Sequence, residues 1–152
     1  MIGSIALKHY LAPHENYEEL NLLPAQTRMF VVEDDILYAK FLQHFALEYN
    51  IHLDVFHPDS DFYNLPRDGE YDVGIIDYDL GYLKGTQIAS LYASTPILLI
   101  SAQDKSEKID SWPSSVCGFS LKHEGVKNLI EKSLTLAGKN GWPSDEGSSY
   151  EN

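Results

Sequence analysis

The sequence predicts an α/β fold: a doubly wound sheet of five parallel strands with helices on both faces. Apolar runs of strand length recur between residues 28 and 121. Several of them are apolar at nearly every position, as in strands buried on both sides. Segments with helical spacing of apolar residues lie between these runs. Alternation of five strands with five helices over about 110 residues indicates parallel strands joined by right-handed crossovers.

The first three strands follow from apolar patterning and from the segments between them. Residues 28–33 form a short apolar run, and residues 51–56 alternate in polarity. Between them, Leu37, Phe41 and Phe45 recur at close to helical spacing. In chain order we expect a strand at 28–33, a helix at 36–49, a strand at 51–56, a short helix at 59–64, a turn at 66–69 and a strand at 72–77.

The second half continues the alternation. Pro96 stands at the start of an apolar run, where a missing backbone donor is tolerated. Val126, Leu129 and Ile130 share one face of a final amphipathic helix, and Gly138 suits its end. The expected elements are a loop at 81–85, a helix at 86–93, a strand at 95–101, a short helix at 104–110, a strand at 116–121 and a helix at 124–137.

Composition bounds the class of protein. The chain has 152 residues, 43% of them hydrophobic, which suits one domain with a sizeable core. No apolar run approaches the roughly 20 residues of a membrane helix, and the N-terminus lacks the features of a secretory signal. Cys117 is the only cysteine, and we expect its small side chain to be buried. Because a single cysteine allows no internal disulfide, a cytoplasmic location is the default expectation. A net charge of −12 argues against binding to nucleic acid or to an anionic membrane.

Three regions are expected along the chain. Residues 1–27 form an N-terminal extension, which Pro13 and Pro24 interrupt and in which 16–23 is compatible with a short helix. Residues 28–138 form the domain. Residues 139–152 are rich in Gly, Ser and acids, and we expect them to be disordered.

Polar residues that close the apolar runs are the strongest functional signal. The first run ends in Glu33, Asp34 and Asp35, and the third ends in Asp77. Ligands of doubly wound sheets bind at the carboxyl ends of the strands, so these acids should converge. Their mutual repulsion is tolerable when a cation is present, and Mg²⁺ prefers carboxylate and carbonyl oxygens. Asp35 is free to cap the helix that follows.

The last two strands add the groups that a phosphate site needs. Ser101 closes the fourth run and can donate a hydrogen bond to a phosphoryl oxygen. Lys122 closes the fifth and can neutralise another oxygen, or pair with Asp77 when no phosphate is bound. Asp77 itself can act as the nucleophile and form an aspartyl phosphate.

As a set, these motifs resemble the receiver domain of two-component response regulators, in a stand-alone form. The matching motifs are VVEDD after the first strand, IIDYDLG around Asp77, LLISA around Ser101 and GFSLK before the last helix. The resemblance covers about residues 28–137. It implies a flavodoxin-like fold with strand order 2-1-3-4-5.

The resemblance also implies roles for individual residues. Asp77 is the phosphoacceptor, and Glu33 and Asp34 hold Mg²⁺ together with Asp77 and the backbone carbonyl of Asp79. The phosphate is contacted by Ser101, which is also a switch residue, and by Lys122. The second switch residue is Phe119.

The same resemblance implies partners and a mode of action. A histidine kinase or histidine phosphotransfer protein donates the phosphoryl group. The output is contact with a downstream protein through the face of the fourth helix, fifth strand and fifth helix, and a homodimer is possible. The chain is then a signalling switch that phosphorylates and dephosphorylates only its own aspartate, not a metabolic enzyme.

Two departures and two alternatives accompany this interpretation. Gly81 and His123 stand where prolines are common in the family, so the bond between Lys122 and His123 is either trans or strained. A haloacid-dehalogenase-type phosphohydrolase would use Asp77 and Asp79, but that family places its acid pair after the lysine. A degenerate receiver that acts only as a scaffold is the other alternative.

Overall fold

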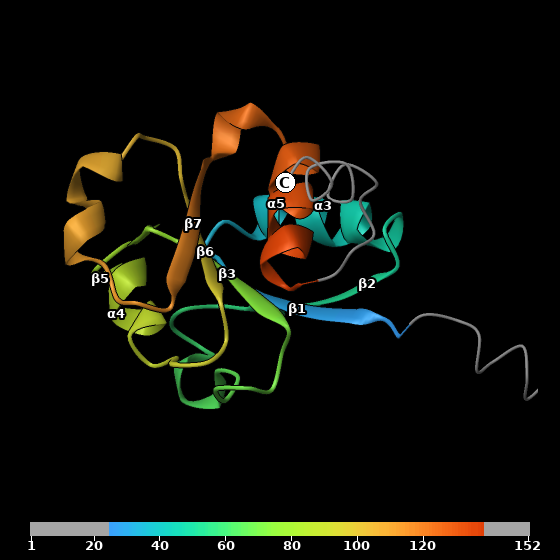
Figure 1. Cartoon of the computed structure of the whole chain (residues 1–152), viewed down its shortest axis with the longest axis horizontal. Helices are drawn as coiled ribbons and strands as arrows, with labels where there is room; N and C mark the ends of the chain where they lie inside the picture. The colour runs from blue at the N-terminus through green and yellow to red at the C-terminus, as the bar shows by residue number, and fades with distance from the viewer. Residues whose placement is uncertain (1–24, 139–152) are drawn as a thin grey trace, which may run out of the picture.

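The computed structural model describes residues 25–138, which form the predicted five-stranded parallel sheet (Figure 1). The strands are β1 (Thr27–Val32), β2 (Ile51–Phe56), β3 (Val73–Asp77), β6 (Ile97–Ser101) and β7 (Val116–Leu121). Their order is β2-β1-β3-β6-β7, which is the predicted 2-1-3-4-5. The difference in numbering comes from a small antiparallel hairpin, β4 (Asp79–Leu80) and β5 (Leu83–Lys84), which begins before the loop expected at 81–85 and overlaps it.

Parts of the predicted domain organisation lie outside the described residues. Strand β1 begins at Thr27, the last position assigned to the extension. The expected short helix at 16–23 and the expected tail at 139–152 are not described, so both remain predictions. Between residues 25 and 138, no helix combines the length and the apolar character that crossing a membrane requires.

Helices cover the two faces of the sheet unequally. On one face, α3 (Ile36–Leu47) and α5 (Val126–Leu136) lie side by side (Figure 1). On the other face, the described residues form one short α-helix, α4 (Gly85–Ala89). The remaining helical segments are single turns or short 3₁₀ helices: η2 (Phe62–Asn64), η3 (Ser106–Ser111) and η4 (Lys122–Glu124).

The expected helices at 59–64 and 104–110 are therefore short 3₁₀ segments. In both cases a proline ends the helical path, because the residue before a proline is pushed into an extended conformation. Leu65 precedes Pro66 and has ψ of 153°, and Trp112 precedes Pro113 and has ψ of 151°. The helix expected at 86–93 is also shorter and ends at Ala89.

The face under α3 and α5 is an aliphatic core. Alternate residues of the central strands, such as Val31 and Ile75, point to this side and are fully buried. They pack against Leu42 of α3 and Leu129 of α5. Burying such side chains contributes roughly 1.5–3 kcal/mol each, so this layer fixes the position of α3 relative to the strand ends.

The opposite face of the sheet, which has less helical cover, is packed with aromatic rings. Phe30 of β1 is fully buried and packs edge-on against Tyr71, with ring centroids 5.4 Å apart. Tyr92 lies 5.4 Å from the same ring, and Phe56 lies 6.2 Å from it. Gly74 makes room for this cluster, because a Cβ atom at that position would lie 2.3 Å from the Phe30 ring.

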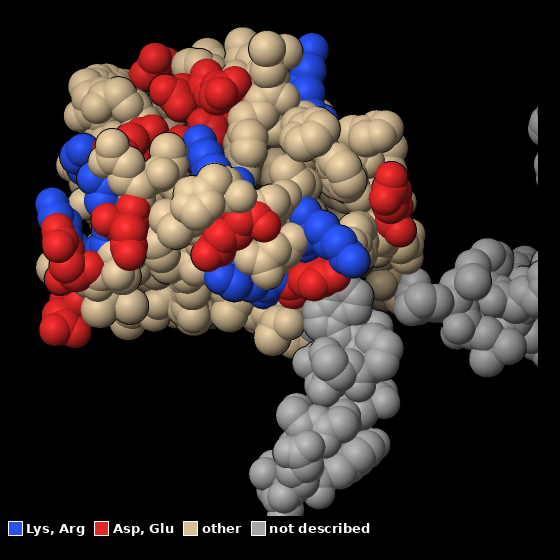
Figure 2. Space-filling view, turned by 90° about the horizontal axis from the view of Figure 1, so that it is seen from above, with Lys and Arg blue, Asp and Glu red and all other residues tan. Residues whose placement is uncertain are grey.

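Charged and half-exposed residues lie at the periphery. The face seen in Figure 2 carries acidic and basic side chains interspersed with other residues, in keeping with a surface that promotes solubility. Strand β7 is an edge strand and only partly buried. The expectation that Cys117 is buried is wrong for this reason: its side chain points away from both cores and is exposed.

We expect Gly74→Ala to destabilise the domain by about 1–3 kcal/mol, because the added methyl overlaps the Phe30 ring in a close-packed core. Urea unfolding measures the change. Gly118→Ala is the matched control, since its Cβ would meet only the ends of leucine side chains, at 3.1 Å and beyond, and should lose less. Equal losses in both variants would contradict this packing argument.

Candidate functional site

The sheet register brings the predicted site residues to one edge. Val32 pairs with Ile76, so Glu33 and Asp77 are at the same level on neighbouring strands. Asp77 in turn pairs with Ile100, the residue before Ser101. Ser101 pairs with Leu121, the residue before Lys122. The carboxyl ends of four strands therefore meet at one site, as the parallel order requires.

Lys122 joins the two buried acids. Its Nζ lies 2.8 Å from Oδ2 of Asp77 and 2.8 Å from Oε2 of Glu33. Glu33 is 1% exposed and Asp77 is 5% exposed, so both carboxylates are largely removed from water. One ammonium group faces two carboxylates, which leaves the set with an excess of negative charge.

The loop after β1 separates the two remaining acids of the first cluster. Asp35 caps α3: its Oδ1 accepts a hydrogen bond of 3.1 Å from the backbone N–H of Tyr38, and its own N–H donates to Oε1 of Glu33. Asp34 is exposed, and its carboxylate approaches those of Glu33 and Asp77. Oxygen atoms of the three residues lie within 4.8 Å of one another.

The loop after β3 orients Asp77 through its backbone. The N–H of Asp79 donates a 3.1 Å hydrogen bond to Oδ1 of Asp77. The Asp79 side chain turns away and pairs with Lys84 at 2.9 Å, across the small hairpin. Gly85 packs directly on the loop: a Cβ there would lie 2.1 Å from the Asp77 carbonyl oxygen. The hairpin turns at Gly81, whose φ of +84° favours glycine.

Ser101 and Phe119, the two predicted switch residues, lie in different environments. Ser101 is fully buried, and its Oγ accepts a 3.1 Å hydrogen bond from the N–H of Gln103. Phe119 is half-buried, with its ring 5.5 Å from Trp112. Trp112 also lies 6.4 Å from Tyr78, the neighbour of Asp77. A row of three aromatic rings thus connects Phe119 with the loop that carries Asp77.

Burial and the crowding of acids set the protonation of this site. Burial raises the pKa of Glu33 to about 8, and the neighbouring Asp77 adds to the rise, while Lys122 opposes it. Burial also disfavours the charge on Lys122. The hydrogen bond to Asp77 and the contact with Glu33 outweigh that effect and raise the pKa of Lys122 above its ordinary value. Lys122 is therefore charged, and the acids compete for it.

Tyr38 is a site residue that the sequence analysis missed. Its ring lies under Lys122, with Nζ 4.7 Å from the ring centroid, so a cation–π contact supports the ammonium group. Its hydroxyl is buried and has no hydrogen-bond partner among residues 25–138. Burial raises the pKa of Tyr38 to about 12. Its position two residues into α3 was the available signal, because that turn of the helix starts at the acid cluster.

Glu124 is a second missed residue, and it holds the turn that follows β7. Its Oε1 accepts hydrogen bonds from the Ser120 hydroxyl at 3.2 Å and from the Leu121 N–H at 3.4 Å. Lys132 of α5 lies 3.6 Å from the same oxygen. Because Leu121 precedes Lys122, these contacts anchor the backbone from which the lysine projects.

His123 continues this turn without a cis bond. No cis peptide occurs between residues 25 and 138, so the bond between Lys122 and His123 is trans. His123 lies inside η4, and Gly125 ends the turn with φ of +106°. A 3₁₀ turn closed by glycine thus stands where the family commonly has a proline.

The donor set fits a divalent cation that prefers oxygen ligands. Three carboxylates approach one another, and Oε2 of the buried Glu33 makes an ion pair but no hydrogen bond within the described residues. Hard cations such as Mg²⁺ bind carboxylates and backbone carbonyls. Glu33, Asp34 and Asp77 would hold the ion, and the Asp79 carbonyl is the backbone ligand that the family resemblance implies.

Comparison with known proteins gives a consistent class. No protein-family model matches the chain. It is 31% identical over 114 residues to the transcriptional regulatory protein PcoR of Escherichia coli, covering 72% of this chain and 50% of that protein. The chain thus spans about half the length of the curated relative that it matches.

Solved structures share the fold at lower identity. The HemR receiver domain of Leptospira biflexa, in its non-phosphorylated form, has a TM-score of 0.64 at 20% identity, covering 74% of this chain and 94% of that one. The chemotaxis response regulator CheY4 of Vibrio cholerae has a TM-score of 0.60 at 17% identity, covering 74% and 99%. A Burkholderia pseudomallei response regulator with a phosphorylated aspartic acid, calcium ion and citrate has a TM-score of 0.59 at 14% identity, covering 84% and 75%. The chain therefore has the fold of response-regulator receiver domains and resembles a response regulator in sequence.

We expect Tyr38→Phe to keep or raise stability, by up to about 1 kcal/mol, because it removes a buried hydroxyl without a hydrogen bond and keeps the ring. Tyr38→Ala removes the ring under Lys122 and should destabilise by about 2 kcal/mol. Thermal unfolding of both variants is the measurement. A clear loss in Tyr38→Phe would show that the hydroxyl has a partner and contradict this assignment.

Proposed function

We propose that this chain is the phosphoacceptor of a two-component or phosphorelay system, with Asp77 as the residue that takes the phosphoryl group. The observation that carries the proposal is the ion-paired set of Lys122, Asp77 and Glu33 at the strand ends, with Asp34 beside it. The phosphorylated aspartate of the Burkholderia relative, which shares this fold, supports the same chemistry.

The side chains of the site have complementary parts in the transfer. One oxygen of Asp77 forms a bond to phosphorus as the bond from phosphorus to the donor's histidine nitrogen breaks, and that nitrogen keeps the electron pair. The hydrogen bond from the Asp79 N–H orients the carboxylate for this attack. Asp77 is nearly buried, so the donor must approach along the axis that the strand ends leave open.

Lys122 and Ser101 bind the oxygen atoms of the new phosphoryl group. Lys122 contacts Asp77 directly and can transfer its ion pair to a phosphoryl oxygen without a large movement. The Ser101 hydroxyl accepts a hydrogen bond, so its own hydrogen is available to donate to a second oxygen. A bound Mg²⁺ supplies neutralisation of the acids and of the phosphoryl oxygens.

The phosphoryl group adds about two negative charges to a buried site, which shifts an equilibrium between two conformations. Ser101 and Phe119 are the proposed switch residues, and the stacking of Phe119 on Trp112 gives a path to the surface. The proposed output face consists of η3, β7 and α5 and contacts a downstream protein. The donor is a histidine kinase or histidine phosphotransfer protein, and the location is the cytoplasm.

This proposal is distinct from the two alternatives. The acids that precede Asp77 lie at the end of β1, before the lysine in sequence, which favours a switch over a phosphohydrolase of the haloacid dehalogenase type. The ion pairing of Lys122 with both acids favours a working receiver over a scaffold. A phosphorylation experiment distinguishes the receiver, the phosphohydrolase and the scaffold.

Incubation with Mg²⁺ and a small phosphodonor should add one phosphoryl group, which intact mass spectrometry detects. Asp77→Asn should abolish the addition because it removes the nucleophile. Asp110→Asn, on the exposed surface of η3, is the matched control and should react like the wild type. Many turnovers of an aryl phosphate would favour the phosphohydrolase. If no donor or kinase adds a phosphoryl group, the degenerate receiver that acts as a scaffold is the remaining explanation.

We further expect Mg²⁺ to stabilise the domain by binding the acid cluster, with about 2.7 kcal/mol gained at a concentration 100 times the dissociation constant. Asp34→Asn should weaken the effect, since it removes an exposed carboxylate of the cluster. Asp79→Asn should retain it, because that side chain faces Lys84. The midpoint of thermal unfolding as a function of Mg²⁺ is the measurement. Loss of the effect in Asp79→Asn alone would overturn this ligand set.

A further inference from the structure

Helix α3 is apolar on the side that faces away from the sheet. Its core side is formed by Ala39, Leu42 and Ala46, which are buried. On the side next to β2, Ile36 is 60% exposed and Leu47 is 75% exposed. These exposed apolar side chains stand beside the polar side chains of Lys40, Gln43 and His44, a mixture that is typical of a surface that contacts another segment. The edge of the sheet beside it, β2, is covered by no other strand of the described residues.

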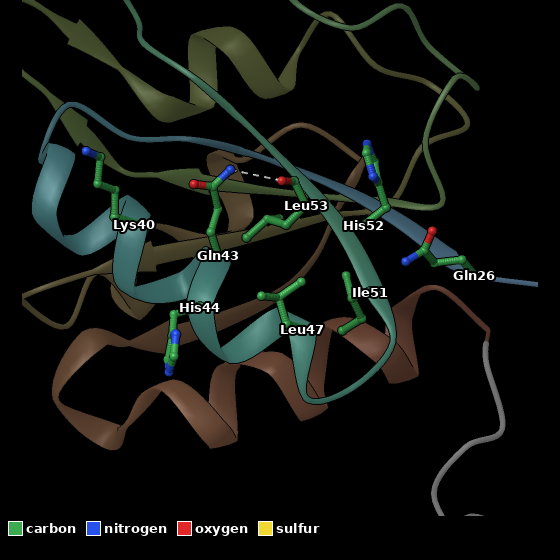
Figure 3. A pocket seen from close by; sticks show the side chains of 8 residues that line it. All are labelled: Gln26, Lys40, Gln43, His44, Leu47, Ile51, His52 and Leu53. Carbon is green, nitrogen blue, oxygen red and sulfur yellow. Dashed lines mark hydrogen bonds between the residues drawn. The ribbon is translucent and has the colours of Figure 1, made fainter. Parts of the chain in front are cut away.

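A groove runs between this side of α3 and β2 (Figure 3). It has a volume of about 500 Å³, and its lining comes from both elements and from the residue that precedes β1. Gln43 crosses it and donates a 3.2 Å hydrogen bond to the carbonyl of Leu53. The lining residues are Gln26, Lys40, Gln43, His44, Leu47, Ile51, His52 and Leu53.

The groove is basic in a strongly acidic chain. Its walls carry the basic side chains of Lys40 and His44, whereas the His52 ring points away from α3, and none of the eight residues that line the groove is acidic. Asp54, the nearest acid on β2, lies with His52 on the face of the strand that points away from α3, and the two pair at 3.0 Å. The net charge of the chain is −12, so this surface differs in sign from the chain as a whole. An acidic, apolar segment fits both its charge and its leucine and isoleucine walls.

The chain carries such a segment immediately before the groove. Residues 15–23 read ENYEELNLL, with three glutamates and four large apolar or aromatic side chains. Gln26, at the end of the groove, follows only three positions after Leu23. With helical spacing, Tyr17, Leu20 and Leu23 would share one side. The three glutamates would lie on the adjacent side, as would suit a groove with apolar walls and a basic rim.

Geometry and tethering favour this segment over other occupants. Helix α3 has 12 residues and is about 18 Å long. Nine residues span about 14 Å as a helix and up to about 30 Å when extended, so residues 15–23 could run along most of α3 in the first form and along all of it in the second. A short covalent link places the segment at a local concentration on the order of millimolar, which a second copy or a foreign peptide must exceed.

We propose that residues 15–23 dock in the groove between α3 and β2. The glutamates pair with Lys40 and His44, and the leucines cover Leu47, which is exposed in the described residues. A second pocket, of about 300 Å³, shares Lys40 and Gln43 with the groove and is lined by Glu33. The docked segment therefore lies one pocket away from the acid cluster, and its release exposes the flank of α3 to other proteins.

A spin label tests this placement in the full chain. A nitroxide at Asn21→Cys, in a Cys117→Ser background, should broaden the amide signals of residues 40–53 and remove most of their intensity. The signals of η3, across the sheet, are the internal reference and should keep theirs. Mixing spin-labelled chain without ¹⁵N with unlabelled ¹⁵N chain should leave all signals sharp.

Charge reversal provides the matched variants. Lys40→Glu should restore the intensity of residues 40–53, and adding Glu18→Lys and Glu19→Lys to it should broaden them again. Lys108→Glu, exposed on η3, is the control and should leave the broadening unchanged. Sharp signals at residues 40–53 in the spin-labelled chain would overturn the proposal. Broadening in the mixed sample would overturn it in favour of a second copy as the occupant.

Discussion

One lysine shared by two buried carboxylates is the interaction on which the site depends. Lys122 contacts Glu33 and Asp77 at equal distances. Both carboxylates are buried, so water does not compensate their negative charge and the ammonium group must do so. Breaking a buried ion pair on one side costs several kcal/mol, because the remaining charge is left without a partner. Burial raises the pKa of Glu33, Lys122 opposes the rise, and the neighbouring Asp77 adds to it, so the two acids share one ammonium group. The site is therefore arranged to accept a further cation, or to release the lysine to a new anion, and both changes favour the binding of phosphate with a metal ion.

The rest of the fold serves to hold these three side chains at that distance. Strand alternation sends Val31 and Ile75 into the aliphatic core, and Phe30 and Ile76 into the aromatic one, so the next residues emerge at the sheet edge in register. Close backbone contacts then limit movement: Gly85 lies against the Asp77 carbonyl, and Glu124 ties the turn that carries Lys122. Tyr38 supports the ammonium group from α3. Each support comes from a different element, so the geometry is over-determined, as a site that must hold its shape through a charge change requires.

The strands and the polar residues at their ends were predictable from the sequence, because burial on both faces leaves an apolar run that any strand of this kind must have. The alternation of strands and helices along the chain predicted a parallel sheet. In a parallel sheet the carboxyl ends of the strands share one edge, so Glu33, Asp77, Ser101 and Lys122 were expected to converge there. The short helices were less predictable, since Pro66 and Pro113 act on the residue before them and reduce a helical pattern to a 3₁₀ turn. Tyr38 and Glu124 were missed because their contacts are with residues distant in sequence or depend on the direction of a side chain, which spacing alone does not encode.

Helix α3 connects the acid cluster with the surface. Its first turn is capped by Asp35, whose N–H also holds Glu33, and its opposite flank forms the wall of the basic groove. A ligand on that flank can influence the acids only if it binds two positions of α3 with different affinity, since equal affinity shifts no equilibrium. The small side chains Ala39 and Ala46 between α3 and the sheet allow close packing, Leu42 is the large side chain of α3 that is fully buried there, and Tyr38 and Phe45 pack partly buried against the same core. Helix α3 fully buries one large side chain and α5 buries four large apolar residues, so α3 is the helix that can slide or tilt more readily. The physical basis for communication between the groove and the site is therefore the position of α3, and the cap at Asp35 is the point at which a shift of the helix reaches Glu33.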